Sequence, residues 1–134
     1  MLRKWVTSNM SETKYMIAEQ TALELIERMF SSWNKQDMES LMPLFTEDIE
    51  LVSNKVMDLL PDANGKIKGR KVLHTYWSAL MQLYPHFQFR LKRLIIEGRV
   101  IIVYYKTDDH QTHCISKLHL TFDGLIERME VVYL

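Results

Sequence analysis

The histidines and the single cysteine that fall within one ten-residue stretch make metal binding the first chemistry to consider: His110, His113, Cys114 and His119. On an extended strand, His113 and Cys114 would point to opposite faces because they are adjacent. His113 and His119 would share a face but lie roughly 20 Å apart. A tetrahedral site needs its ligands around one ion. We therefore expect no metal site and no cofactor.

Cys114 alone could act as a nucleophile only with a nearby base and a lowered pKa. The sequence shows neither, so we interpret it as a small buried thiol. A chain with one cysteine forms no intrachain disulfide. That count is typical of a reducing compartment, and we expect a cytoplasmic protein.

The charge balance argues against a polyanionic partner. The chain has 17 basic and 17 acidic residues and a formal net charge of zero. Its basic cluster has no interleaved aromatic residues on which bases would stack: Lys66, Lys68, Arg70 and Lys71. No apolar run approaches the roughly 18 residues of a membrane span. We expect neither nucleic acid nor membrane as a partner.

The length of 134 residues predicts one domain. Met10-Ser11-Glu12 reads as a plausible second start, and whether Met1 or Met10 begins the protein stays open. We expect residues 1–10 to be a tail and residues 11–134 to be the domain.

Helical patterns dominate the first half of the chain. Apolar residues recur every three or four positions over about residues 13–33, which predicts a helix with one apolar stripe. Asp37 is a suitable N-cap for a second helix through Phe45, with a kink or break at Pro43. A third helix is expected over about residues 70–83, before Pro85.

The second half of the chain reads as strands. An early strand is expected at residues 49–53, followed by two short extended pieces around an Asn64-Gly65 turn. Four long strands are expected at residues 87–97, 100–107, 112–122 and 125–133, joined by tight turns into an antiparallel meander. The apolar run 100–105 predicts a central strand buried on both faces. Helices followed by strands indicate an α+β domain.

Short motifs in a fixed order support this architecture. They are Trp33-Asn34-Lys35-Gln36-Asp37, Leu44-Phe45-Thr46-Glu47-Asp48-Ile49, Gly69 before the third helix, and Leu120 to Ile126 at the last hairpin. Together they resemble the SnoaL-like branch of the nuclear-transport-factor-2-like superfamily over about residues 16–134. The resemblance implies a cone-shaped fold, with three N-terminal helices packed in a strongly curved antiparallel sheet.

The same resemblance allows the ketosteroid-isomerase reaction to be tested by position. That chemistry needs a carboxylate base and two hydrogen-bond donors that stabilise the enolate oxygen. The aligned positions hold Met29, Ser53 and Leu118, none of which fits its role, so we expect no such activity. Epoxide hydrolysis would need two carboxylates and an arginine, and Arg128 and Glu130 are expected to point away from the interior.

The resemblance also implies an interior cavity large enough for a ligand. The positions expected to line it are mostly apolar or aromatic: Met29, Trp33, Leu51, Ser53, Leu73, Trp77, Cys114, Ser116, Leu118, Met129, Val131 and Tyr133. Phe122 is expected to point inward by strand phase. Such a lining suits a small hydrophobic molecule held by one or two hydrogen bonds.

Three functions remain as hypotheses. The first is binding of a small hydrophobic ligand with little or no catalysis. The second is a lyase, isomerase or hydrolase, polyketide cyclase-like, using polar groups among Tyr104, Tyr133, His74, Ser53 and Glu50. His74 with Tyr104 or Tyr105 would be a dehydratase-like set. The third is an accessory or protein-interaction subunit. The resemblance also implies a homodimer interface on the outward strand face, from His113 to Thr121 at alternate positions.

Overall fold

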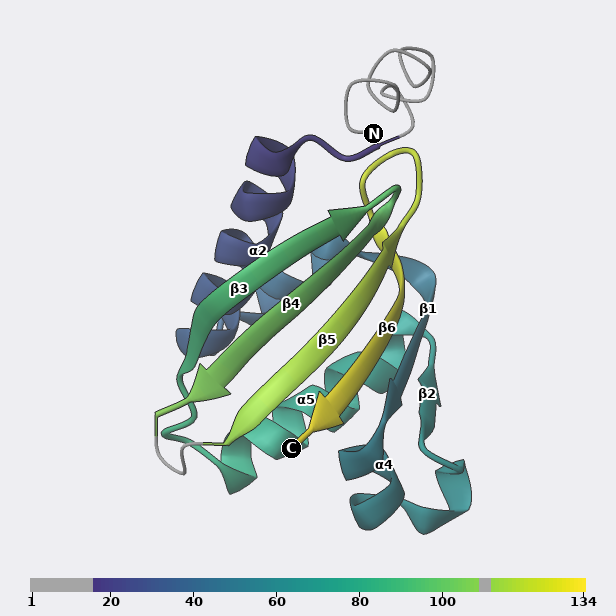
Figure 1. The fold of residues 1–134 in the computed structure, drawn as a ribbon. Coiled ribbons are helices and arrows are strands. Elements are labelled where there is room, and N and C mark those ends of the chain that lie inside the picture. Colours follow the sequence, from purple (N-terminus) through teal and green to yellow (C-terminus); the bar gives the residue numbers. More distant parts are fainter. Residues whose placement is uncertain (1–15, 109–111) are drawn as a thin grey trace, which may run out of the picture.

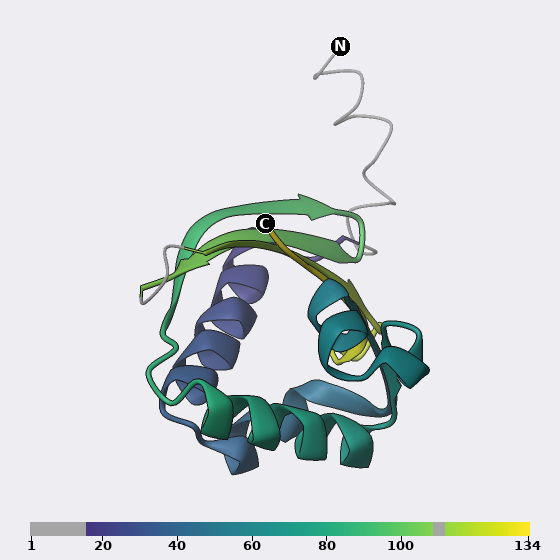
Figure 2. The same cartoon turned by 90° about the horizontal axis from the view of Figure 1, so that it is seen from below.

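The computed structural model describes residues 16–108 and 112–134. Helices lie on one face of a six-stranded sheet that curves around them (Figures 1 and 2). The expected tail, residues 13–15 of the first predicted helix and the turn at Asp109-His110 lie outside the described residues. Among the described residues, no helix is both long and apolar enough to cross a bilayer.

The first described helix, α2 (Glu19–Asn34), buries the stripe that the sequence predicts, with Ile26 and Met29 facing the interior. Its last residue ties it to the sheet. The Asn34 side chain donates to the Phe89 carbonyl at 3.1 Å and accepts from the Phe89 N–H at 2.8 Å. This side chain therefore supplies the backbone of β3 with both hydrogen bonds that a neighbouring strand would give.

A short helix, α3 (Met38–Leu41), follows and is capped as predicted, because the Asp37 carboxylate accepts from the Ser40 N–H at 3.2 Å. Pro43 then falls in the 3₁₀ turn η2 (Met42–Leu44), which confirms the expected break. Helix α5 (Arg70–Leu83) confirms the third predicted helix. It begins after Gly69, whose backbone φ of 96° is rarely adopted by residues other than glycine.

The strands are β1 (Phe45–Ser53), β2 (Lys66–Lys68), β3 (Phe89–Glu97), β4 (Val100–Thr107), β5 (His113–Leu120) and β6 (Ile126–Tyr133). They lie in the order β2-β1-β6-β5-β4-β3. The meander β3 to β6 is antiparallel as expected. The pair β1 and β6 is parallel, so the sheet is mixed rather than wholly antiparallel.

Three local expectations were wrong. Residues in β4 alternate between buried and half-buried, so this inner strand is covered fully on one face only. Phe122 is 73% exposed, because β5 ends at Leu120 and Phe122 lies in the turn that follows. The segment after Ser53 is the helix α4 (Asn54–Leu59), followed by the turn η3 (Pro61–Ala63), rather than an extended piece.

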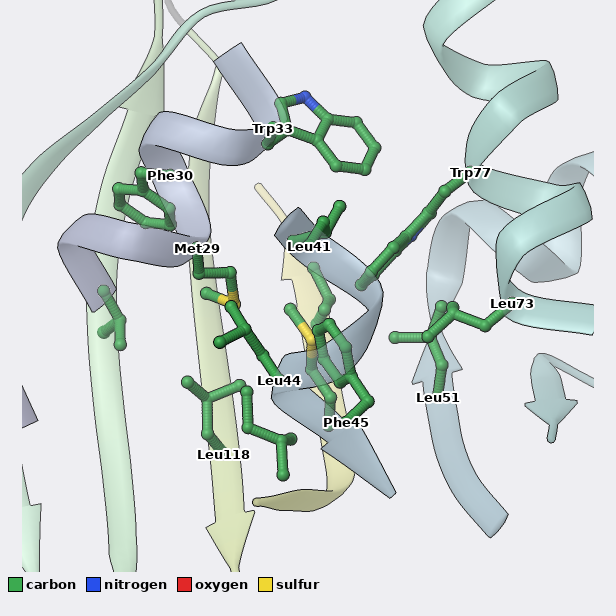
Figure 3. Packing of buried hydrophobic residues seen from close by; sticks show 14 of the residues in the cluster. Met29, Phe30, Trp33, Leu41, Leu44, Phe45, Leu51, Leu73, Trp77 and Leu118 are labelled. Atoms are coloured by element: carbon green, nitrogen blue, oxygen red, sulfur yellow. The ribbon is translucent and has the colours of Figure 1, made fainter. Parts of the chain in front are cut away.

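The core lies between the helices and the concave face of the sheet. Figure 3 shows Met29, Leu44, Phe45 and Leu118 pointing toward one another from α2, η2, β1 and β5. Trp77 joins them from α5, with its ring 5.2 Å from that of Phe45 and edge-on. Aromatic pairs of this geometry add to the stabilisation from buried area.

Candidate functional site

The pairing of the strands sorts the inward side chains into rows that cross the sheet. One row, which we call the tyrosine row, is Tyr105, Cys114 and Tyr133. The next, the serine row, is Val103, Ser116, Val131 and Ser53. Two apolar rows follow: Ile101, Leu118, Met129 and Leu51, and then Leu120, Ile126 and Phe45. The polar groups of the concave face therefore gather toward one end of the strands.

A cavity lies where these rows meet α2 and α5. Its residues are Met29, Phe30, Trp33, Leu41, Leu51, Ser53, Tyr76, Trp77, Phe89, Tyr105, Met129, Val131 and Tyr133. Its volume is about 30 Å³, room for one or two water molecules. Pockets that hold small ligands span about 300–1,000 Å³. The structure does not show a ligand-sized cavity in this conformation, because aromatic and methionine side chains fill most of the space, and that expectation stays a prediction.

Eight of the twelve residues expected to line the cavity border it: Met29, Trp33, Leu51, Ser53, Trp77, Met129, Val131 and Tyr133. The other four, Leu73, Cys114, Ser116 and Leu118, are buried nearby in the core without bordering it. Whether any of these residues binds a ligand stays a prediction.

The lining also contains five residues that the sequence did not assign to it: Phe30, Leu41, Tyr76, Phe89 and Tyr105. Tyr76 lies within the third predicted helix at helical spacing from Leu73 and Leu80, so its burial could be predicted. The sequence of β4 gave no signal for Tyr105, because the apolar run 100–105 does not alternate. The burial pattern of the folded strand shows that Tyr105 faces inward in phase with Val103.

Three tyrosine side chains converge on the end of the cavity that the tyrosine and serine rows border. We call these two rows together with Tyr76 the tyrosine end, and the two apolar rows the apolar end. Tyr105 Oη lies 2.7 Å from Ser116 Oγ, and both groups are buried. Tyr76 is 7% exposed, and its hydroxyl has no hydrogen-bond partner among the described residues.

Burial keeps the hydroxyls and the thiol at this end protonated. It raises the pKa of Tyr76 to about 12 and the pKa of Cys114 to about 11. It also raises the pKa values of Tyr105 and Tyr133 well above their usual range. The tyrosines are therefore hydrogen-bond donors at neutral pH, whereas the Cys114 thiol is a poor nucleophile.

None of the residues that border the cavity is an aspartate, glutamate or histidine. The site therefore offers donors that would stabilise an oxygen, but no evident general base. Met29 and Ser53, at two of the isomerase positions, border the cavity. Ser53 Oγ already accepts from the Lys55 N–H at 3.1 Å, which caps α4.

The remaining polar candidates lie away from the cavity. His74 is exposed on α5. Tyr104 is on the convex face of the sheet, where its hydroxyl is 2.6 Å from Nδ1 of His113. Glu50 pairs with Arg128 on that same face, as expected for an outward arginine. No cluster of three potential metal ligands occurs in the part of the chain that the structure describes.

The convex face carries a short apolar row between charged residues. Val132, Ile115 and Tyr104 lie directly opposite one another on β6, β5 and β4. Val132 is 47% exposed and Ile115 is 38% exposed. Glu130 and Lys117 flank this row, one on each of two neighbouring strands.

A mixed, curved sheet that packs its concave face on helices defines an α+β domain of the nuclear-transport-factor-2-like class. The family model for the SnoaL-like domain matches residues 26–129, and the chain belongs to this family. The sequence has no significant match among curated proteins.

Solved structures share the fold at low sequence identity. A SnoaL-like protein of unknown function from Burkholderia thailandensis has a TM-score of 0.83 and 14% identity, over 89% of this chain and 98% of that one. A candidate ketosteroid isomerase from Kribbella flavida has a TM-score of 0.65 and 22% identity, over 86% and 78%. The epoxide hydrolase/cyclase-like enzyme SalBIII, which has a role in pyran ring formation in the polyether salinomycin, has a TM-score of 0.66 and 19% identity, over 87% of this chain and 92% of that one.

Proposed function

We propose that this protein binds a small, flat, mostly hydrophobic molecule between its helices and the concave face of its sheet. The observation that carries the proposal is the Tyr76 hydroxyl, which borders an aromatic-lined cavity and has no partner among the described residues. Burying a hydroxyl without a hydrogen bond costs about 1–3 kcal/mol. A ligand oxygen at this position would remove that cost.

Binding requires the cavity to expand from its volume of about 30 Å³. Met29 and Met129 border it from opposite walls, one on α2 and one on β6. Methionine has three rotatable bonds and repacks more readily than other apolar side chains. Movement of these two side chains would admit a flat molecule without unfolding either element.

Binding is favoured over catalysis by the chemistry of the lining. Two of the proteins with similar solved structures are a candidate ketosteroid isomerase and an epoxide hydrolase/cyclase-like enzyme. In this chain the cavity has tyrosine donors and no bordering carboxylate or histidine. An isomerase, lyase or hydrolase activity, polyketide cyclase-like, is the second candidate and would need a base carried by the substrate or by solvent.

A homodimer through the convex face is the assembly we propose. The exposed apolar row of Val132, Ile115 and Tyr104 supports it, together with the opposite charges that flank this row on Lys117 and Glu130. A two-fold axis near the row would bring the apolar rows of two copies into contact. Val132→Glu should yield a monomer by light scattering, and an unchanged mass would contradict this assembly. An accessory role through the same face is the alternative.

Ligand binding is tested by a thermal-shift screen against steroids, polyketide-like aromatics, terpenoids and fatty acids. A ligand at 100 times its Kd stabilises the fold by about 2.7 kcal/mol, which raises Tm by several degrees. The variant Met129→Phe, which fills the cavity, should lose the shift. Ile95→Phe, at an exposed position of β3, should retain it. No saturable shift with any class, or equal shifts in both variants, would contradict the proposal.

A further inference from the structure

Lys55 is held at the tyrosine end by the residues on either side of the junction between β1 and α4. Ser53 caps α4 by accepting from the Lys55 N–H. The Asn54 side chain donates to the Tyr133 carbonyl and accepts from the Tyr133 N–H, both at 3.0 Å. Asn54 thus continues the β1 pairing by one residue, which fixes the start of α4 beside the last residue of β6.

This arrangement brings the Lys55 ammonium onto two aromatic rings. Its Nζ lies 5.0 Å from the centre of the Tyr133 ring and 4.7 Å from that of Tyr84. Tyr133 borders the cavity, and the positive charge of Lys55 also acts on Cys114 in the same row. The two rings attract the ammonium through cation–π contacts but supply no negative charge to neutralise it.

The charges around Lys55 do not neutralise it. The structure gives Lys55 no ion pair with any carboxylate in the described ranges. The ionisable groups that face it are Tyr133, Tyr84 and Cys114. Tyr76, whose hydroxyl lacks a partner, interacts with Tyr84 and so shares a neighbour with Lys55. Lys55 does not itself border the cavity, but its ammonium lies against the ring of Tyr133, which does. The tyrosine end therefore has a cation beside it and, within it, a hydroxyl that lacks a partner among the described residues.

We propose that the ligand is a flat apolar acid whose carboxylate is held by Lys55 and the Tyr76 hydroxyl, with its hydrocarbon part lying among Met29, Trp33 and Trp77. This inference rests on the proposed function and names the chemical class of the ligand. A carboxylate accepts from an ammonium and a hydroxyl at once, and such charge-assisted hydrogen bonds are about twice as strong as neutral ones. The aromatic and methionine lining accounts for the remainder of the ligand.

The test compares 2-naphthoic acid with its neutral counterpart 2-naphthalenemethanol, measured by calorimetry at pH 7 and low salt. The wild-type protein should bind the acid at least 10-fold more tightly. Lys55→Met should remove this preference by weakening the acid to the level of the alcohol, while Lys55→Arg retains most of it. Lys92→Met, at an exposed position of β3, is the matched control and should behave as wild type. Tyr76→Phe should weaken the acid several-fold.

The outcomes separate this inference from the proposed function. If acid and alcohol bind wild type equally, or if Lys55→Met leaves the acid preference intact, the acidic class is wrong and the binding function stands. If neither probe binds, although the protein gave a hit in the thermal-shift screen, the proposed class of flat apolar acids is also wrong. If nothing binds in either experiment, both proposals fall. Circular dichroism and Tm of each variant confirm that it is folded.

Discussion

The tyrosine end and the apolar end are built on the same four strands and are buried to similar degrees, yet their chemistry differs. At the apolar end, Leu118 and Ile126 are fully buried, and no inward side chain carries a hydroxyl, a thiol or a charge. At the tyrosine end, the inward groups include Tyr105, Ser116 and Cys114. The rows are adjacent, so the change happens within a few residues along each strand. The extent of burial therefore does not distinguish the candidate site from the rest of the core. The presence of polar inward groups in the rows of the tyrosine end does.

The largest expected effect lies at the apolar end. Leu118→Ala should lower the free energy of unfolding by about 2–5 kcal/mol, because the leucine is fully buried and its loss leaves a cavity. Urea denaturation measures this change. Ile95→Ala, at an exposed position of β3, is the control and should cost much less. A similar loss for both would break the contrast between packed interior and surface.

The next effect concerns pH at the tyrosine end. Tyr76 has its pKa raised to about 12 in the folded protein, against 10.0 for an ordinary tyrosine. Between about pH 10 and 12 the unfolded chain loses this proton and the folded protein keeps it, so stability falls as pH rises. One such group contributes a slope of about 1.4 kcal/mol per pH unit.

Tyr76→Phe should therefore make the fall in stability between pH 10 and 12 less steep, while leaving stability at pH 7 unchanged or slightly higher. Denaturant titrations at several pH values measure the slope. An identical slope in the variant would show that this tyrosine titrates as an ordinary one, and the distinction between the two ends would weaken.

The smallest effect tests the hydrogen bond between Tyr105 and Ser116, at 2.7 Å. Tyr105→Phe should cost about 1–2 kcal/mol, because it leaves the buried Ser116 hydroxyl without its partner. Adding Ser116→Ala should recover part of this loss, since neither group then lacks a partner. Additive losses in the double variant would mean that the two hydroxyls do not depend on each other.

Local patterns account for what the sequence predicted. The three- and four-residue spacing in α2 and α5, the cap at Asp37 and the break at Pro43 are all decided by neighbours in the chain. The alternation along β5 and β6 placed Ser116 and Val131 on the concave face for the same reason. Eight of the residues predicted to line the cavity border it because they follow these periods.

The remainder depends on contacts between distant residues. The parallel pairing of β1 with β6 cannot be read from either strand alone. Lys55 was missed because the sequence after Ser53 shows no clear periodicity. Its position depends on the hydrogen bonds of Asn54 to the backbone of Tyr133, 79 residues away. Phe122 was misplaced because β5 ends at Leu120, two residues before the alternation would have turned Phe122 inward. The cavity volume depends on how the methionine and aromatic side chains fill the interior, which no periodicity describes.

The parallel pair of β1 and β6 has a consequence for the order of folding. Glu50 and Arg128 face each other across it and are 78 residues apart in the chain. Contacts at such separation form slowly, because a long loop must close before they stabilise anything. During synthesis β1 has no partner on that side until β6 has left the ribosome. The first half of the chain would then expose the unpaired backbone N–H and C=O groups along one edge of β1 for several seconds, at the usual rate of roughly 5–20 residues per second.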